Sequence, residues 1–246
     1  MTAILSTPRR ALVTGASGGL GQAIAERLAT SGVHVLAHAN SRAAEAQAVA
    51  ERIAAAGGSA EAVVFDVTDR AATQAACEKM LIGGAVQIVV NNAGIHDDAA
   101  FPALREEQWQ RVIDVSVNGF FNVTQALVMP MIRTRWGRII NLSSIASLTG
   151  NRGQVNYAAA KGAINSATKS LALELASRGI TVNAVAPGII DSGMAGAVFD
   201  AATIERLVPM KRAGRADEVA ALVAFLASDD AGYISGQVVS INGAMI

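Results

Sequence analysis

The chain has 246 residues, of which 52% are hydrophobic and 4% aromatic, and its twenty basic and twenty acidic residues cancel to a formal charge of zero. This balance excludes a general electrostatic attraction to nucleic acid or to an anionic membrane, so we expect neither as a partner. The length fits one large α/β domain, and no linker or low-complexity stretch divides the chain, which predicts a single domain over residues 1–246.

Cysteine count and hydropathy bear on the compartment. The single Cys77 excludes an internal disulfide framework and a Cys-rich metal site, and we expect no metal. Residues Met1 to Arg10 lack an apolar core of signal-peptide length, and no apolar run approaches the ~20 residues that span a bilayer. These features predict a cytoplasmic protein that is neither secreted nor embedded in a membrane.

Seven short β-branched runs alternate with longer Ala-rich segments. Most of the runs are apolar on both faces, which is typical of parallel strands buried on each side, and the segments between the first six are long enough for a crossover helix. The pattern predicts a doubly wound α/β fold with about seven parallel strands and helices on both faces. The expected strands are residues 11–14, 33–37, 62–65, 86–90, 138–142, 181–185 and 237–241.

Helix signals fall where this pattern requires them. The expected helices include residues 20–30, 43–56, 107–133 and 216–227, and an Ala-rich helix carries Tyr157 and Lys161. The longest irregular segment runs from Pro187 to about Ala213. It follows the carboxyl end of a strand, where such sheets bind ligands, and this favours a lid over residues 188–213. The alternative is a pair of helices.

A glycine-rich turn joins the first expected strand to the first expected helix. Glycines let the backbone approach a pyrophosphate, and the helix N-terminus adds free N–H groups and a partial positive charge. The spacing differs from the commoner dinucleotide fingerprint, and a plain glycine turn is the alternative. The position after strand one favours a dinucleotide site. Its expected contacts are Gly15, Ser17, Gly18, Gly19, Leu20 and Gly21.

The second strand ends in Asn40-Ser41-Arg42 and has no acidic residue there. An acid at this place would bind the ribose 2′-hydroxyl of NAD, whereas Arg42 can pair with a phosphate and its two neighbours can donate to it, which favours NADP(H). The alternative is an exposed arginine at a helix start. Later strand ends should follow the nucleotide too, although each could be a simple turn or cap. They supply Asp66, Val67, Asn92, Ala93 and Gly94.

Three further residues form the expected catalytic set. The strand 138–142 is followed by Ser143-Ser144, and Tyr157 and Lys161 lie one helical turn apart, so they share a helix face. A phenol has an ordinary pKa near ~10, and an ammonium at ~4 Å lowers that pKa toward neutral pH. A surface Tyr and Lys without a shared role is the alternative. The spacing from Ser144 and the glycine turn argue for catalysis.

These motifs together resemble the short-chain dehydrogenase/reductase family over nearly the whole chain. The resemblance implies a Rossmann-type domain in which Ser144 holds the substrate oxygen, Tyr157 transfers the proton, and Lys161 also binds the nicotinamide ribose. It further implies cofactor contacts at Pro187, Gly188, Ile189 and Ser192. The family's catalytic asparagine falls by register on Ser116 in this chain. Asn118 is the alternative, but two residues rotate a helix by ~200°, so it should point elsewhere unless the helix is broken.

Within the family, the segments Gly153–Lys161 and Ser177–Gly188 are most similar to 3-oxoacyl-acyl-carrier-protein reductases. That resemblance implies NADPH-dependent reduction of a 3-oxoacyl thioester to its 3-hydroxyacyl form in fatty-acid or related polyketide or polyene synthesis. Arg135 and Arg178 match two basic positions that dock the acidic carrier protein, unless they are simply solvated. The alternatives are an NADP-dependent dehydrogenase of small alcohols or sugars and a noncatalytic nucleotide-binding subunit. The long helix 107–133 and the apolar C-terminus suggest a homotetramer.

Overall fold

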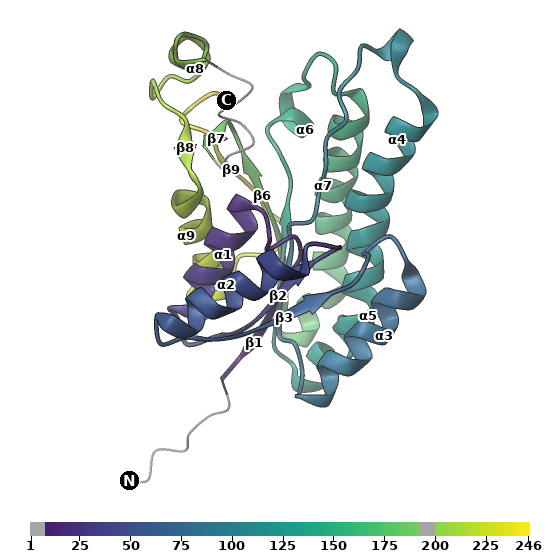
Figure 1. The fold of residues 1–246 in the computed structure, drawn as a ribbon, viewed down its shortest axis with the longest axis vertical. Coiled ribbons are helices and arrows are strands. Elements are labelled where there is room, and N and C mark those ends of the chain that lie inside the picture. The colour runs from purple at the N-terminus through teal and green to yellow at the C-terminus, as the bar shows by residue number, and fades with distance from the viewer. Residues whose placement is uncertain (1–7, 192–199) are drawn as a thin grey trace.

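A computed structural model of the protein describes residues 8–191 and 200–246, and its centre is a parallel seven-stranded sheet (Figure 1). The strand order is β3-β2-β1-β4-β5-β6-β9, so the direction of winding reverses between β1 and β4. This order confirms the predicted doubly wound fold. The strands are β1 Arg10–Val13, β2 His34–Ala39, β3 Ser59–Val64, β4 Ile88–Asn91, β5 Gly137–Leu142, β6 Ile180–Pro187 and β9 Val238–Ile241.

Two helical layers cover the sheet, one on each face (Figure 1). The first layer contains α1 Gly19–Ala29, α2 Ala43–Ala55 and α9 Ala216–Ala227. The second contains α3 Arg70–Ile82, α4 Glu106–Ile113, α5 Gly119–Thr134 and α7 Val155–Leu175, with the short α6 Ala146–Thr149 beside α7. The expected helices at 20–30, 43–56 and 216–227 are therefore present within one residue of their predicted ends.

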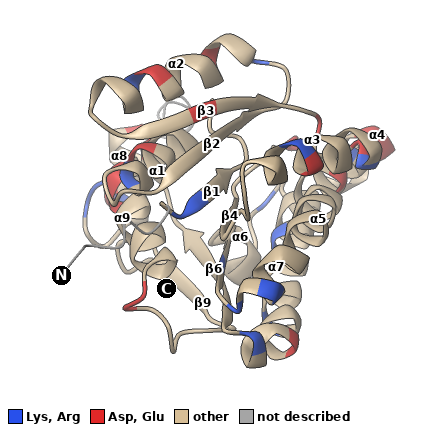
Figure 2. Cartoon of the chain, turned by 90° about the horizontal axis from the view of Figure 1, so that it is seen from below, with Lys and Arg blue, Asp and Glu red and all other residues tan. Residues whose placement is uncertain are grey.

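Alternate residues of each strand enter different cores. In β1, Ala11 and Val13 pack with the first helical layer, whereas Leu12 packs with the second. Both sets are fully buried, which is why the strand is apolar at every position. Lys, Arg, Asp and Glu lie mainly on the outer helices and loops, and the strands are largely free of them (Figure 2).

The expected helix 107–133 is a continuous helical path from Glu106 to Thr134, but it contains a π-helical turn at Asp114–Asn118 between α4 and α5. Contrary to the sequence prediction about apolar runs, this path is long and apolar enough to meet a length-and-composition criterion for a membrane span. Val123, Leu127 and Met131 on α5 are fully buried against the sheet. Core helices of globular domains have the same property.

The segment after β6 is less irregular than the sequence suggested. Its described part holds the short strand β7 Ile190–Asp191 and the helix α8 Ala201–Leu207, and β7 pairs in parallel with β8 Gly214–Arg215. The expected lid also covers residues 192–199, which lie outside the described part of the chain. A lid function for 188–213 stays a prediction.

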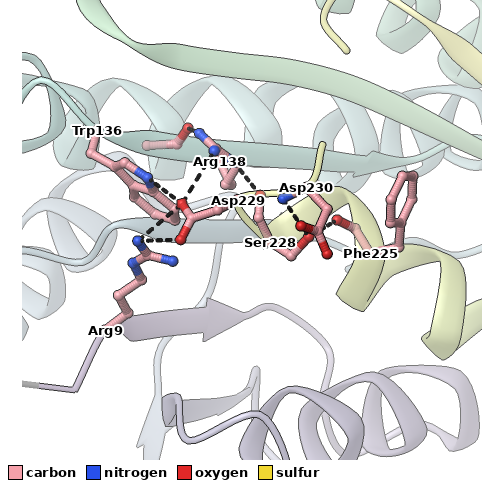
Figure 3. A network of polar contacts seen from close by, with 8 residues as sticks. Arg9, Trp136, Arg138, Phe225, Ser228, Asp229 and Asp230 are labelled. Atoms are coloured by element: carbon pink, nitrogen blue, oxygen red, sulfur yellow. Dashed lines mark hydrogen bonds and ion pairs between the residues drawn. The ribbon is translucent and has the colours of Figure 1, made fainter. Parts of the chain in front are cut away.

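A cluster of side chains lies at the edge of the sheet where the strands begin (Figure 3). It consists of Arg9, Trp136, Arg138 and Asp229 and is called the clasp below. Asp229, which follows α9, accepts hydrogen bonds from Arg9 at 2.9 and 3.0 Å and from the indole of Trp136 at 3.0 Å. The guanidinium carbons of Arg9 and Arg138 lie 3.9 and 4.3 Å from the Trp136 ring centroid. The clasp joins the starts of β1 and β5 to the end of α9, so Trp136 has a structural role here.

Candidate active site

The glycine turn lies between β1 and α1, at the edge where the strands end. Gly15 has a positive φ of 66°, which favours glycine. A Cβ on Gly21 would clash with the Gly15 carbonyl oxygen and lie 2.6 Å from the Asn92 amide, so this glycine allows α1 to pack close to β1. The turn therefore needs its glycines for two different reasons, backbone conformation and close packing.

Asn92 fastens the glycine turn to the end of β4. Its side-chain amide donates to the carbonyl oxygens of Thr14 at 2.8 Å and Gly15 at 3.2 Å. In return, the Thr14 hydroxyl accepts hydrogen bonds from the backbone N–H groups of Asn92 and Ala93. Two motifs that are 78 residues apart thus form one unit, and Asn92 acts on the turn rather than only on a ligand.

The geometry of the turn fits a pyrophosphate. Gly18 is the N-cap of α1 and provides no side-chain hydrogen bond to the helix, so the first N–H groups of α1 are free of a side-chain cap. A Cβ on Gly18 would approach only the Gly15 carbonyl oxygen, at 3.5 Å, and Gly19 is exposed. Ser17 and Leu20 are half-buried beside them. An anion can therefore reach these backbone donors.

The expected adenosine contacts differ in how they are placed. Asn40, Ser41 and Arg42 are exposed between β2 and α2, in reach of a ligand at this edge. Asp66 also lies at the edge, but its Oδ1 accepts hydrogen bonds from the N–H and hydroxyl of Thr68, so it closes a turn. The Val67 side chain is buried, 2.9 Å from the position a Cβ on Gly119 would take. Only the backbone of Val67 is suited to contact a nucleotide.

Ser144 and Tyr157 meet through their side chains. Ser144 follows β5, and its Oγ accepts a hydrogen bond from the Ala146 N–H at 3.2 Å. Tyr157 lies in the first turn of α7, where its N–H donates to the Asn156 side chain at 2.8 Å. The Ser144 side chain lies close enough to Tyr157 to lower the pKa of the phenol. The two residues that the sequence placed 13 positions apart are therefore neighbours in the fold.

The direction of the Tyr157 pKa differs from the sequence prediction. Burial raises the pKa of Tyr157 above its ordinary value of 10.0, the nearby Ser144 side chain lowers it only in part, and the charge of Asp98 raises it further. The ammonium of Lys161 lies 5.6 Å from the Tyr157 ring centroid and donates to the Leu142 carbonyl oxygen at 2.7 Å. The net direction is opposite to the one expected from a nearby ammonium, because desolvation of the phenol is the largest contribution.

Lys161 is itself strongly affected by its surroundings. Its side chain is buried on α7, and burial lowers the pKa of Lys161 to about 8. Gly94 leaves room for the ammonium, since a Cβ there would lie 3.1 Å from Lys161 Nζ. The loop after β4 and the helix α7 are thus in direct contact.

The π-helical turn places the two candidates for the fourth catalytic position, Ser116 and Asn118, in different surroundings. Ser116 is 4% exposed, and its Oγ has no hydrogen-bond partner among the described residues. Asn118 is exposed and donates to Asp114 Oδ1 at 2.6 Å. Ser116 is therefore the residue that points inward, and Asn118 is occupied on the surface side of the helix.

The end of β6 borders the same edge. Pro187 accepts a hydrogen bond from the Ile145 N–H, and Gly188 donates to Ile241 at 2.9 Å. The carbonyl of Ile189 accepts from the Gly214 N–H at 2.9 Å, which holds β8 beside the segment. Ser192 lies outside the described residues, so its expected contact stays a prediction.

Arg135 and Arg178 lie far from this edge. Arg135 lies two residues before the start of β5 and Arg178 lies two residues before the start of β6, whereas Ser144 follows the end of β5. Six residues of β5 separate the two ends of the strand, a span of about 20 Å. Arg135 also donates to the Ser177 carbonyl oxygen at 2.9 Å. Within one chain, the two arginines are next to each other but not next to Tyr157.

Asn156 is the residue that sequence reasoning missed. It is fully buried, accepts the Tyr157 N–H, and donates to the carbonyl oxygens of Asp97 at 2.9 Å and Gln108 at 3.3 Å. It thereby joins the start of α7 to the loop after β4 and to α4. The available signal was an asparagine at the start of a helix, directly before the tyrosine.

Comparisons with known proteins agree with this geometry. A family model described as short chain dehydrogenase matches residues 9–203. The 3-oxoacyl-acyl-carrier-protein reductase FabG of Escherichia coli (strain K12) is 44% identical over 238 residues, covering 96% of each chain. The reductase of the same name from Aggregatibacter actinomycetemcomitans is 44% identical over 236 residues, covering 95% of this chain and 98% of the relative.

A solved structure extends the likeness to three dimensions. A gluconate 5-dehydrogenase from Burkholderia cenocepacia J2315, in complex with NADP and tartrate, superimposes with a TM-score of 0.91 at 35% identity. The match covers 96% of this chain and 94% of that one.

Proposed function

The chain is an oxidoreductase of the short-chain dehydrogenase family, and we propose that it reduces 3-oxoacyl thioesters to 3-hydroxyacyl thioesters with NADPH. The observation that carries this proposal is the meeting of Ser144, Tyr157 and Lys161 at the edge of the sheet that also holds the glycine turn. The full-length likeness to two 3-oxoacyl-acyl-carrier-protein reductases supports the choice of substrate.

The reaction divides between the cofactor and four side chains. NADPH supplies the hydride for the ketone carbon when it is bound. The Ser144 hydroxyl holds the ketone oxygen, and Tyr157 Oη donates the proton that this oxygen takes up. Lys161 binds the ribose and keeps a positive charge beside the tyrosine. Ser116, with its free buried hydroxyl, holds the water that returns a proton toward Lys161.

The positive charge of Lys161 matters because burial opposes proton loss by Tyr157. A raised phenol pKa makes Tyr157 a protonated group at neutral pH, which suits its role as the acid in a reduction. The same phenol would serve as the base in the reverse reaction, so the pKa of Tyr157 bears on its protonation state and not on the direction of the reaction.

The preference for NADPH over NADH rests on Arg42. Its exposed guanidinium, with Asn40 and Ser41 beside it, lies where a 2′-phosphate would be bound, and no acid stands at the end of β2. The NADP complex of the structural relative supports this choice. A cytoplasmic location and a homotetrameric assembly belong to the same proposal.

A second function has a specific observation in its favour. The relative with a TM-score of 0.91 is a dehydrogenase of gluconate, so a dehydrogenase of sugar acids or small alcohols shares this fold. Initial rates with acetoacetyl thioesters and NADPH, compared with rates for gluconate and small alcohols with NADP⁺, separate the two. NADPH binding without turnover of any of these substrates would favour the noncatalytic subunit.

Tyr157→Phe tests the mechanism directly. The variant keeps the ring and loses the proton donor, so we expect thioester reduction to fall by about 10²–10⁴-fold with NADPH affinity retained. Ser144→Ala provides the companion measurement, because it removes the hydroxyl that holds the ketone. Reduction at the wild-type rate by Tyr157→Phe would show that another group donates the proton.

A further inference from the structure

His38 is a buried residue of β2 that has no role in the proposed reaction. Its side chain is 1% exposed and lies beside the Phe65 ring, with ring centroids 4.1 Å apart. Its Nδ1 accepts a hydrogen bond from the Gly15 N–H at 3.1 Å, and its Nε2 lies 2.8 Å from the Phe65 carbonyl oxygen. One imidazole therefore joins the glycine turn to the residue that directly precedes Asp66 and Val67.

The two partners determine the form of the ring. The Gly15 N–H can only donate, so Nδ1 must be an acceptor, and the Phe65 carbonyl can only accept, so Nε2 must carry the proton. Only the neutral Nε2–H form satisfies both contacts. Burial lowers the pKa of His38 to about 4, although the Phe65 hydrogen bond and the charge of Asp66 raise it in part. The neutral form is thus the form present at ordinary pH.

The contacts of His38 also define which donors of the turn remain for a ligand. The backbone carbonyl of His38 accepts a hydrogen bond from the Ala16 N–H at 2.8 Å. The N–H groups of Gly15 and Ala16 are both consumed by this one residue. A pyrophosphate must therefore use donors farther along the turn, at the start of α1, whose position depends on how Gly15 is held.

We propose that His38 is a positioning residue for the dinucleotide, whose neutral imidazole sets the spacing between the glycine turn and the end of β3. The proposal rests on the proposed function in one respect, namely that the ligand of this edge is NADP(H). β2 lies between β1 and β3 in the sheet, so a side chain at its end can reach both segments at once. The loss of His38 affects how tightly the cofactor binds, and not how fast hydride is transferred.

Three substitutions separate the two contacts. His38→Asn keeps an acceptor at the place of Nδ1, so it preserves the bond to Gly15 and loses the bond to Phe65. His38→Gln keeps a donor at the place of Nε2 and loses the acceptor for Gly15. His38→Phe keeps a ring and loses both. His34→Asn is the matched control, since His34 begins the same strand and contacts neither Gly15 nor Phe65: its Nδ1 lies 2.7 Å from the Ser59 hydroxyl and its Nε2 lies 3.6 Å from Glu61 Oε1.

The first measurement needs no turnover. The dissociation constant of NADPH is measured from nicotinamide fluorescence, and kcat is measured at saturating NADPH. We expect His38→Phe to raise the dissociation constant at least tenfold with kcat within threefold of wild type, His38→Asn to raise it less, and His34→Asn to match wild type. Binding by folded His38→Phe within twofold of wild type overturns the proposal, and so does a loss of kcat with unchanged binding.

The second measurement uses the protein without nucleotide. Amide hydrogen exchange at Gly15 is expected to be faster in His38→Gln and His38→Phe than in wild type and His38→Asn, because only the first two lack the Nδ1 acceptor. Unchanged Gly15 protection in His38→Gln overturns the proposal, and this comparison still decides if His38→Phe does not fold. Wild-type protein that binds neither NADPH nor NADH refutes the proposed function, whatever the exchange at Gly15 shows.

Discussion

At the scale of single residues, Lys161 lies in surroundings that disfavour its positive charge. Lys161 is buried, its ammonium has a backbone carbonyl as its hydrogen-bond acceptor, and its pKa is lowered from 10.5 to about 8. A folded-state pKa below the unfolded value means that the charged form is destabilised by folding. The site therefore keeps a positive charge beside Tyr157 at the expense of stability.

Lys161→Met is expected to abolish reduction and to stabilise the fold at pH 7 by about 2 kcal/mol, because it removes a buried charge but leaves the Leu142 carbonyl without its donor. In wild type, the unfolded chain holds more protons than the folded chain between pH 8 and 10.5, so the free energy of unfolding should rise with pH across this window. Urea unfolding at pH 7, 8 and 10 measures both effects. A less stable Lys161→Met at pH 7 would contradict this account.

Ser116 is the opposite case, a buried hydroxyl with no partner among the described residues. The proposed role gives this hydroxyl a water as its partner, so we expect Ser116→Ala to lower the free energy of unfolding by about 0.5–1.5 kcal/mol. The proposed role of Ser116 in holding a water predicts a several-fold fall in kcat in the same variant. Thermal unfolding and steady-state rates give the two numbers, with Ser116→Asn as a comparison that is expected to raise kcat. If kcat is unaffected by alanine, the relay does not use Ser116.

At the scale of elements, the glycine turn proposed to bind the nucleotide is held by the junction of β1, α1 and β4. Gly21 lets α1 pack against Gly15 and Asn92, and Asn92 holds the turn from the side of β4. Neither α1 nor β4 forms this site alone. The same principle applies to α7, which depends on Asn156 for its connection to the loop after β4.

Gly21→Ala tests this junction, and Gly162→Ala is its control within a helix. A methyl on Gly21 meets Gly15 and Asn92, whereas one on Gly162 meets nothing within 4 Å. We expect Gly21→Ala to destabilise the protein by about 1–3 kcal/mol and to weaken NADPH binding. Gly162→Ala should stabilise it by about 0.5–1 kcal/mol. Both are measured by chemical unfolding and NADPH titration, and equal effects at the two positions would refute the argument.

At the scale of the whole molecule, apolar side chains are left on the outer surface of the second helical layer. Phe121 and Met129 on α5 and Leu173 on α7 are 46%, 50% and 84% exposed. Exposed apolar groups on adjacent long helices are suited to contact with another copy. They support the proposed homotetramer, which static light scattering can test.

The positions of Arg135 and Arg178 bear on how a carrier protein would deliver its thioester to the proposed homotetramer. The two arginines lie about 20 Å of strand away from Ser144 in their own chain, and we infer that a carrier protein docked on them delivers its thioester to another subunit of the proposed homotetramer. Mixed oligomers of Tyr157→Phe and Arg135→Glu/Arg178→Glu should therefore reduce acyl-carrier substrates, although each variant alone does not. Turnover of a small thioester by the double variant serves as the control. Inactive mixed oligomers would show that the arginines do not act between subunits.

Local spacing along the chain was enough to predict the strands, most of the helices, the glycine turn and the proximity of Tyr157 to Lys161. Strand and helix periodicities and an interval of four residues are properties of neighbouring positions, and they hold wherever the segment lies. Helical geometry also predicted that Asn118 points away from Ser116, and Asn118 bonds to Asp114 on the surface side; the catalytic role of Ser116 stays a prediction.

Only the tertiary structure decided the rest, because those features depend on residues far apart in sequence and on burial. The bonds of Asn92 to the glycine turn, of Asn156 to α4, and of His38 to Gly15 and Phe65 cannot be read from spacing. Removal of water from around Tyr157 reversed the expected direction of its pKa, since desolvation disfavours the charged form. The proposed catalytic residues Ser144, Tyr157 and Lys161 lie close together in sequence, whereas the burial that sets their pKa values depends on segments far away in sequence.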